Sequence, residues 1–158
     1  MTIKLNDTAL LRAGPYIDGQ WRTSSAGTLA VRNPATSAIV TEIATADRAM
    51  TNEAILAAHR AMKDWQAVSA KARAQVLRRW FDLMMAHQDD LAVIMTTEQG
   101  KTLAESRGEV AYGAAFMEWF GEQAKRVDGD VIPAPSGDKR VICIKQPVGV
   151  VAAITPWN

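Results

Sequence analysis

Apolar residues recur at helical spacing in the middle of the chain. Four of them are three, four and three residues apart and therefore share one face of a predicted helix: Ile55, Ala58, Met62 and Trp65. The stretch from Asp47 to Thr51 supplies suitable N-cap residues ahead of this stripe, and Ser69 is a suitable cap for a second helix. The apolar face of the second helix is expected to contain Val76 or Leu77, Trp80, Phe81, Met84 and Met85.

Two further helices are indicated by signals at their ends. The polar run 87–90 marks a boundary before a third helix, and Gly100 suits the left-handed residue that ends it. Thr102 and Glu105 match a capping box, which predicts a long fourth helix to about Arg126. Its expected buried face contains Val110, Ala114, Met117, Gly121 and Ala124. Glycines inside this helix cost about 1 kcal/mol each relative to Ala, so close packing against a neighbour is expected.

Shorter β-forming runs precede the helices. Residues 16–21 predict a hairpin, because Asp18 and Gly19 tolerate the positive φ angles of a type I′ turn. Leu29 to Arg32 and Ala38 to Ala44 predict two more strands, separated by the breaker Asn33-Pro34. Residues 1–13 show no strong period and are expected to be a loose leader.

Two strands are predicted after the helices, Val141 to Gln146 and Val148 to Thr155, with Pro147 between them. The second is almost wholly apolar, as is typical of a strand buried on both faces of a sheet. Helices followed by such a strand favour an α/β fold over a helical bundle. Ligands of open α/β sheets bind just past the carboxyl ends of strands, which draws attention to residues 155–158.

Composition narrows the possible functions. The 158 residues carry a net charge of +1, with 48% apolar and 22% charged residues, so nothing favours nucleic acid or an anionic membrane as a partner. A basic helix face at Lys71, Arg73, Arg78 and Arg79 lacks the stacking aromatics of a nucleic-acid site. No apolar run of 18 residues predicts a membrane span. A single cysteine suits a reducing cytoplasm.

The motifs in the second half of the chain carry a family resemblance. The sequence EQGKTLAESRGEV is followed by EWF, then by KQPVGVVAA and ITPWN. In this order and spacing they resemble the aldehyde dehydrogenase superfamily, in particular its NAD(P)-dependent succinate-semialdehyde dehydrogenase branch. The resemblance runs from about Tyr16 to Asn158 and covers about the first third of a family member.

The resemblance implies a domain division and a fold. A leader at 1–13 precedes the N-terminal part of an NAD(P)-binding domain at 14–138. Residues 139–147 form a strand of a protruding hairpin used in subunit assembly, and 148–158 form the first Rossmann-like strand and the start of an active-site loop. The implied fold is α/β: a small antiparallel β region, helices, the assembly strand and the first strand of the central sheet.

The resemblance also implies a site at the end of that strand. Asn158 would donate its side-chain amide to the oxyanion of a thiohemiacetal, although spacing alone favours a turn residue after a strand. Residues next to it would contact NAD or NADP, partly through their backbone: Ile154, Thr155, Pro156 and Trp157. For Trp157, packing as a core aromatic is the alternative. No metal site is expected, apart from a weak indication that carbonyls near Val31 and Glu98 hold a monovalent cation.

Other reactive residues are expected to be structural. Cys143 lies between two isoleucines, where an apolar setting raises the pKa of a thiol, so it is not predicted to be the nucleophile. His59 and His87 are expected to be solvated. Glu118 and Glu122 are expected to pair with Lys125 or Arg126, and Lys101 to be a surface lysine.

The implied parent reaction oxidises succinate semialdehyde, or a similar ω-carboxy aldehyde such as glutarate semialdehyde, to the acid with NAD or NADP. The family's nucleophilic cysteine and general-base glutamate have no counterpart in these 158 residues, so the chain alone is expected to be inactive. A homodimer or homotetramer is expected for the parent enzyme. The alternative is a non-catalytic helical interaction or oligomerisation module derived from this family.

Overall fold

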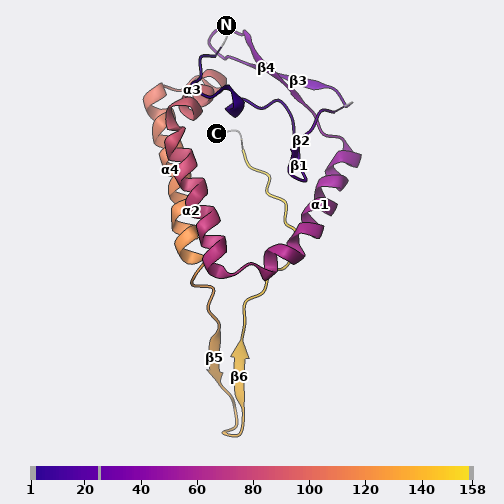
Figure 1. Cartoon of the computed structure of the whole chain (residues 1–158), viewed down its shortest axis with the longest axis vertical. Coiled ribbons are helices and arrows are strands. Elements are labelled where there is room, and N and C mark those ends of the chain that lie inside the picture. The colour runs from indigo at the N-terminus through magenta and orange to yellow at the C-terminus, as the bar shows by residue number, and fades with distance from the viewer. Residues whose placement is uncertain (1–2, 25, 157–158) are drawn as a thin grey trace.

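The computed structural model describes residues 3–24 and 26–156, which form a ring of helices and small sheets with a projecting hairpin (Figure 1). The helices are α1 (Arg48–Ala67), α2 (Ala70–Ala86), α3 (Gln88–Gln99) and α4 (Leu103–Gln123), and a short 3-10 helix η1 spans Thr8–Leu10. The strands pair antiparallel in consecutive twos: β1 (Tyr16–Ile17) with β2 (Gln20–Trp21), β3 (Thr28–Arg32) with β4 (Ile39–Ala44), and β5 (Asp130–Pro133) with β6 (Arg140–Cys143). No helix in the described ranges is long and apolar enough to cross a membrane. This mixed α/β architecture confirms the predicted fold class.

The helix ends follow the predicted capping signals. Asp47 accepts a hydrogen bond from the Met50 backbone N–H at 2.8 Å, and Ser69 caps α2 in the same way. Thr102 and Glu105 form a complete capping box at the start of α4. Gly100 ends α3 with a φ of 81°. Helix α4 ends at Gln123, three residues before the predicted Arg126.

The core lies where α4 packs against α2 and α3. Ala92, Ser106 and Ala114 are fully covered there, and the Ser106 hydroxyl lies 2.8 Å from the hydroxyl of Thr96. The predicted α4 face is confirmed, since Val110, Ala114 and Gly121 are buried and Met117 and Ala124 are half-buried. These contacts are made mainly by small residues, which let the helix backbones approach closely.

Gly121 shows why one of the α4 glycines is needed. A Cβ atom added there would lie 3.4 Å from Cβ of Leu77 and 3.5 Å from the Ala74 carbonyl oxygen on α2. The predicted compensation of glycine by close packing therefore holds at Gly121. At Gly108 nothing lies within 4 Å of the added atom, so this glycine has no packing role among the described residues.

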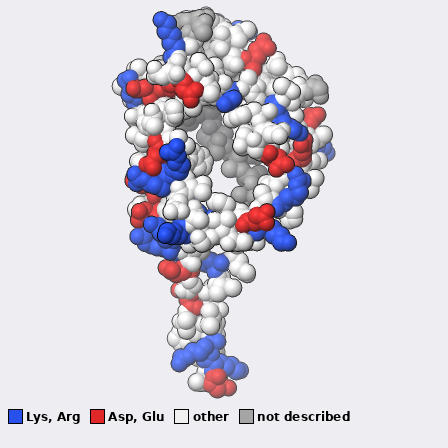
Figure 2. All heavy atoms as spheres, in the orientation of Figure 1, with Lys and Arg blue, Asp and Glu red and all other residues white. Residues whose placement is uncertain are grey.

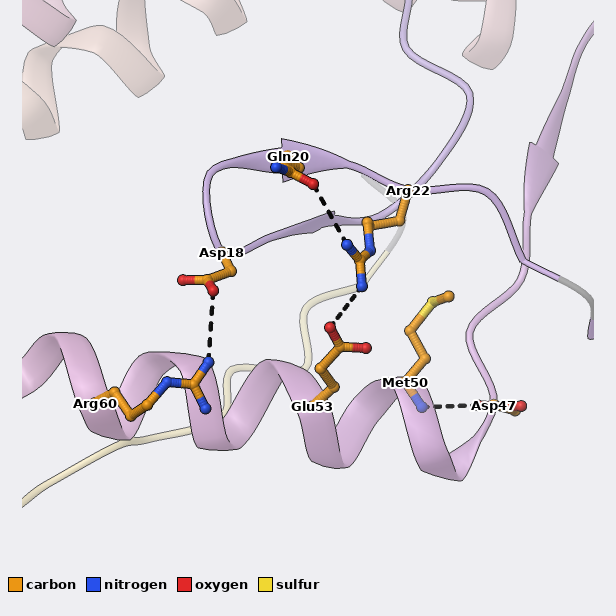
Figure 3. Close-up of polar contacts among 7 residues, drawn as sticks. All are labelled: Asp18, Gln20, Arg22, Asp47, Met50, Glu53 and Arg60. Atoms are coloured by element: carbon orange, nitrogen blue, oxygen red, sulfur yellow. Dashed lines mark hydrogen bonds and ion pairs between the residues drawn. The ribbon is translucent and has the colours of Figure 1, made fainter.

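The first hairpin is fixed to α1 by charged side chains. Asp18 and Gly19 have φ angles of 51° and 77°, which confirms the predicted turn. Arg22 binds Glu53 on α1 at 2.6 Å, and Arg60 on α1 binds Asp18 at 3.5 Å (Figure 3). Strands β3 and β4 also confirm their predictions.

The apolar stripes predicted for α1 and α2 are mostly not buried within the described part of the chain. Ile55 and Trp65 are about half exposed, as is Trp80. One residue of each helix is buried, Ala57 in α1 and Ala74 in α2. The periodicity correctly identified the helices. The predicted face of α2 is half-buried at Leu77, Phe81, Met84 and Met85, whereas few described elements face the stripe of α1.

The predicted strand from Val148 to Thr155 is not formed. Residues 144–156 have no regular secondary structure, and Val148 and Ile154 are 93% and 98% exposed. A strand needs a neighbour for its backbone hydrogen bonds, and no described strand pairs with this segment. The preceding strand, β6, is shorter than predicted, and its partner β5 was not predicted as a strand.

The N-terminal segment is anchored instead of loose. The buried carboxylate of Asp90 accepts hydrogen bonds from the backbone N–H groups of Asn6 and Asp7 at 2.9 and 2.8 Å, and from the Asn6 amide at 3.0 Å. The backbone donors of Asn6 and Asp7 lower the pKa of Asp90 below its ordinary value. Part of the predicted leader is thus attached to the start of α3.

We expect Asp90→Asn to lower the Tm at pH 7, because an amide replaces one acceptor oxygen with a donor that faces a backbone N–H. The lowered pKa means that Asp90 stabilises the fold above its ordinary value of 3.8 and loses this effect as pH falls through the folded value. The Tm difference from wild type should therefore narrow as pH falls below 3.8. Asp64→Asn, at an exposed position on α1, is the control. A difference independent of pH would contradict the anchoring role.

We expect alanine to act oppositely at two glycines of α4. Gly108→Ala should stabilise the protein by about 1 kcal/mol through helix propensity alone. At Gly121 the same gain should be cancelled or reversed, because overpacking costs about 1–3 kcal/mol. Urea unfolding of both variants measures the difference in the free energy of unfolding. Equal gains at the two positions would show that α2 accommodates the added methyl group without a loss of stability.

Candidate functional site

The predicted site residues lie at the end of an extended segment. Trp157 and Asn158 fall outside the described residues. Ile154, Thr155 and Pro156 are exposed, and the segment that carries them runs from the hairpin back between α1 and the α2–α4 pair (Figure 1). The structure thus brings the described part of the predicted cofactor edge to the inside of the ring, where it is open to a ligand or to further protein.

Helix α1 contacts this segment on one side. Gly149 and Val150 line a shared apolar surface with Met62 and Trp65 of α1. The predicted stripe of α1 therefore faces the C-terminal segment, even though the segment covers only part of it. Gly149 has a φ of 134°, a conformation that L-residues rarely adopt.

The described groups suit neutral contacts with a dinucleotide. The segment 146–156 contains no charged residue. Ile154 offers an apolar side chain, Thr155 a hydroxyl, and both residues offer backbone N–H and C=O groups outside any sheet. These groups fit an uncharged ring and its amide, and they supply no cation for phosphate groups.

The remaining reactive side chains do not assemble into a second site. Cys143 ends β6 opposite Asp130 and is exposed, so the apolar setting expected from its isoleucine neighbours does not cover it. His59 lies on α1, and His87 at the junction of α2 and α3. Within residues 3–24 and 26–156, no group of three or more His, Cys, Asp or Glu side chains is placed to hold a metal ion.

Glu118 and Glu122, one turn apart on α4, belong to separate ion pairs. Glu122 binds Arg126 at 3.5 Å, as predicted, whereas Glu118 binds Arg78 of α2 at 3.2 Å in place of a residue on its own helix. Both pairs are exposed and solvated, so the two carboxylates do not form a catalytic dyad.

Lys101 is less exposed than predicted. Its side chain is 19% exposed and forms an ion pair with Glu109, which joins the α3–α4 turn to α4. Glu98, three residues earlier, is half-buried, and burial raises the pKa of its carboxyl. Val31 is nearly buried in β3. A monovalent cation near Val31 and Glu98 stays a prediction.

The hairpin β5–β6 projects from the ring and is apolar on both faces. Val131 lies opposite Ile142, and Ile132 opposite Val141, so each cross-strand pair occupies one face. All four side chains are exposed. Figure 2 shows acidic side chains at the base of the hairpin, an uncharged middle and a charged tip, where the sequence places Asp138, Lys139 and Arg140. The sequence analysis missed β5 because the strand contains only two β-forming residues, Val131 and Ile132, next to Pro133.

Comparisons with known proteins converge on one family. A model described as "Aldehyde dehydrogenase family" matches residues 21–158. The chain is 55% identical to glutarate-semialdehyde dehydrogenase from Pseudomonas aeruginosa, over 99% of this chain and 32% of the relative. It is 52% identical to the NADP(+) succinate-semialdehyde dehydrogenase GabD of Escherichia coli (strain K12), over 99% of this chain and 33% of the relative. The chain thus spans about a third of the length of these relatives.

Solved structures agree with this result. The crystal structure of an E. coli NADP-dependent enzyme matches with a TM-score of 0.95 and 51% identity, over 98% of this chain and 32% of that one. A betaine aldehyde dehydrogenase from Staphylococcus aureus in complex with NAD+ matches with a TM-score of 0.79 and 28% identity, over 87% of this chain and 28% of that one.

Proposed function

The chain belongs to the aldehyde dehydrogenase family, and from this premise we propose that it forms the amino-terminal third of an enzyme that oxidises a semialdehyde with a distal carboxylate to the acid. The observation that carries the proposal is identity of 52–55% with glutarate- and succinate-semialdehyde dehydrogenases across 99% of the chain. Both substrates are ω-carboxy aldehydes.

Asn158 supplies the oxyanion donor in this proposal. When a thiolate attacks the aldehyde carbonyl, the carbonyl oxygen gains negative charge, and a neutral amide N–H placed beside it stabilises that charge. The bond strengthens mainly in the transition state, so it contributes to kcat more than to substrate binding.

In this proposal the segment Ile154–Trp157 contacts one edge of the cofactor. NAD or NADP, when bound, accepts the hydride from the substrate carbon. The chain's own part is to present backbone groups and apolar side chains at one edge of the cofactor and to keep water away. The absence of carboxylates from 146–158 suits this role, because a fixed negative charge nearby would repel the developing oxyanion.

The hairpin β5–β6 serves as an assembly arm between subunits. An isolated two-stranded hairpin cannot bury two apolar faces by itself, and both faces here are exposed. A homodimer or homotetramer that covers them is the proposed state, and the cytoplasm is the proposed compartment.

The alternative function is a non-catalytic interaction module. The observation that favours it is the large exposed apolar surface, in which Trp119 of α4 and Trp80 of α2 take part. The experiment below separates the two functions, because a module would support no aldehyde oxidation when joined to the remainder of a family member.

We expect a chimera of residues 1–158 joined to the remaining two thirds of the P. aeruginosa relative to oxidise succinate or glutarate semialdehyde with NAD or NADP. In this chimera Asn158→Ala should lower kcat by about 10²–10³-fold, while cofactor affinity changes little. Single-turnover hydride transfer and cofactor titration measure the two effects, and Asn52→Ala on the exposed face of α1 is the matched control. A folded chimera inactive with both aldehydes would contradict the enzyme function. Normal turnover with poor cofactor binding would make Asn158 a cofactor-positioning residue.

We expect Ile142→Lys in the chimera to shift its mass toward smaller species, because a charge on the 70% exposed Ile142 face would have to be buried on assembly. Light scattering at low micromolar concentration measures the mass. Leu56→Lys makes the same change at an exposed position of α1 and should leave the mass unchanged. Equal masses for wild type and Ile142→Lys would rule out the arm as an assembly element.

A further inference from the structure

A groove of about 460 Å³ lies between residues 3–4, the β3–β4 hairpin and α3. We call it the N-terminal groove. Its apolar lining consists of Ile3, Ala38, Ile39, Val40 and Val93. Its volume is in the range of small-molecule sites. It lies at the end of the ring where the N-terminal segment passes α3 and β4 (Figure 1), and none of residues 154–156 lines it.

The Asp90 anchor builds one wall of this groove. Asp90, at the start of α3, holds Asn6 and Asp7 through three hydrogen bonds. The chain then continues back to Ile3 and Lys4, which face Val93 one turn further along α3 across the groove. The wall is therefore attached to the same helix that forms the groove floor.

The polar groups of the groove complement an anion. Lys4 contributes the only charged side chain among the described lining residues, and no carboxylate lines the groove. Thr97 already donates to the Val93 carbonyl at 2.6 Å. The Asn33 side-chain oxygen accepts from two backbone N–H groups, which leaves its amide as a donor. The groove thus combines apolar walls with one cation and a neutral donor.

We propose that the N-terminal groove binds a small aliphatic monocarboxylate, with its carboxylate at Lys4 and Asn33 and its alkyl chain against Ile39 and Val93. Charge complementarity selects an anion, and the apolar walls select an alkyl chain over a second charged group. This ligand class differs from the ω-carboxy aldehydes of the proposed reaction, so the proposal does not rest on that reaction.

Titration calorimetry with octanoate tests the proposal on the protein and three variants. Octanoate should bind saturably at one site per chain, whereas glutarate and 1-octanol should bind more weakly. Lys4→Gln should weaken octanoate binding by about two- to fivefold, the scale of an exposed ion pair. Val93→Trp should abolish binding by filling the groove, and Lys63→Gln, an exposed lysine on α1, should leave it unchanged.

Ala38→Leu fills the groove from the opposite wall and replaces Val93→Trp if the tryptophan variant fails to fold by circular dichroism. Loss of binding in either folded variant supports the proposal. Absence of saturable binding to the wild type overturns it. The proposal is also overturned if a folded variant with a filled groove binds octanoate as tightly as the wild type does. Octanoate would then lie on exposed apolar surface elsewhere. Equal affinity for octanoate and 1-octanol overturns the role of Lys4.

Discussion

Close packing of helix α4 against α2 and α3 is the constraint on which the rest of the structure depends. The fully covered residues at this contact are alanine and serine, and Gly121 lets the α2 backbone approach within van der Waals distance. Small residues give short interaxial distances and bring the backbones together, but each buries little apolar area. The described core is therefore closely packed but buries little apolar area.

The large apolar side chains lie mostly outside this core. Tyr112, Phe116 and Trp119 follow one exposed face of α4, and the C-terminal segment exposes most of its valines. Monomeric soluble proteins rarely expose apolar surface of this extent without a partner. Relatives three times longer than this chain provide a simple account, because in them further protein is available to cover these faces. The same account explains why an almost wholly apolar run lacks a sheet: its hydrogen-bonding neighbours are not among the described residues.

This distribution also explains which features could be predicted from the sequence. Caps and turns depend on residues a few positions apart, so Asp47, Ser69, Thr102 and the Asp18-Gly19 turn were predicted correctly. The α4 face was predicted because its partner helices are neighbours along the chain. The stripe of α1 was predicted as one apolar face, but its exposure was not, because periodicity reports which residues share a face and not what covers that face. The Asp90 anchor joins residues 84 positions apart and leaves no local pattern.

The candidate site was predicted from a motif resemblance and not from the spacing of residues. Nothing in the spacing of residues 154–158 distinguishes an oxyanion donor from a turn, and the motif resemblance alone supplied the assignment. The described part of this segment carries no charge from Gln146 onward and lies beside α1, but residues 154–156 are exposed. Electrostatic interactions strengthen where water is excluded. Under the proposed role, a neutral amide stabilises a developing oxyanion more in such surroundings than on an open surface. The role proposed for Asn158 therefore depends on cover that the described residues do not supply.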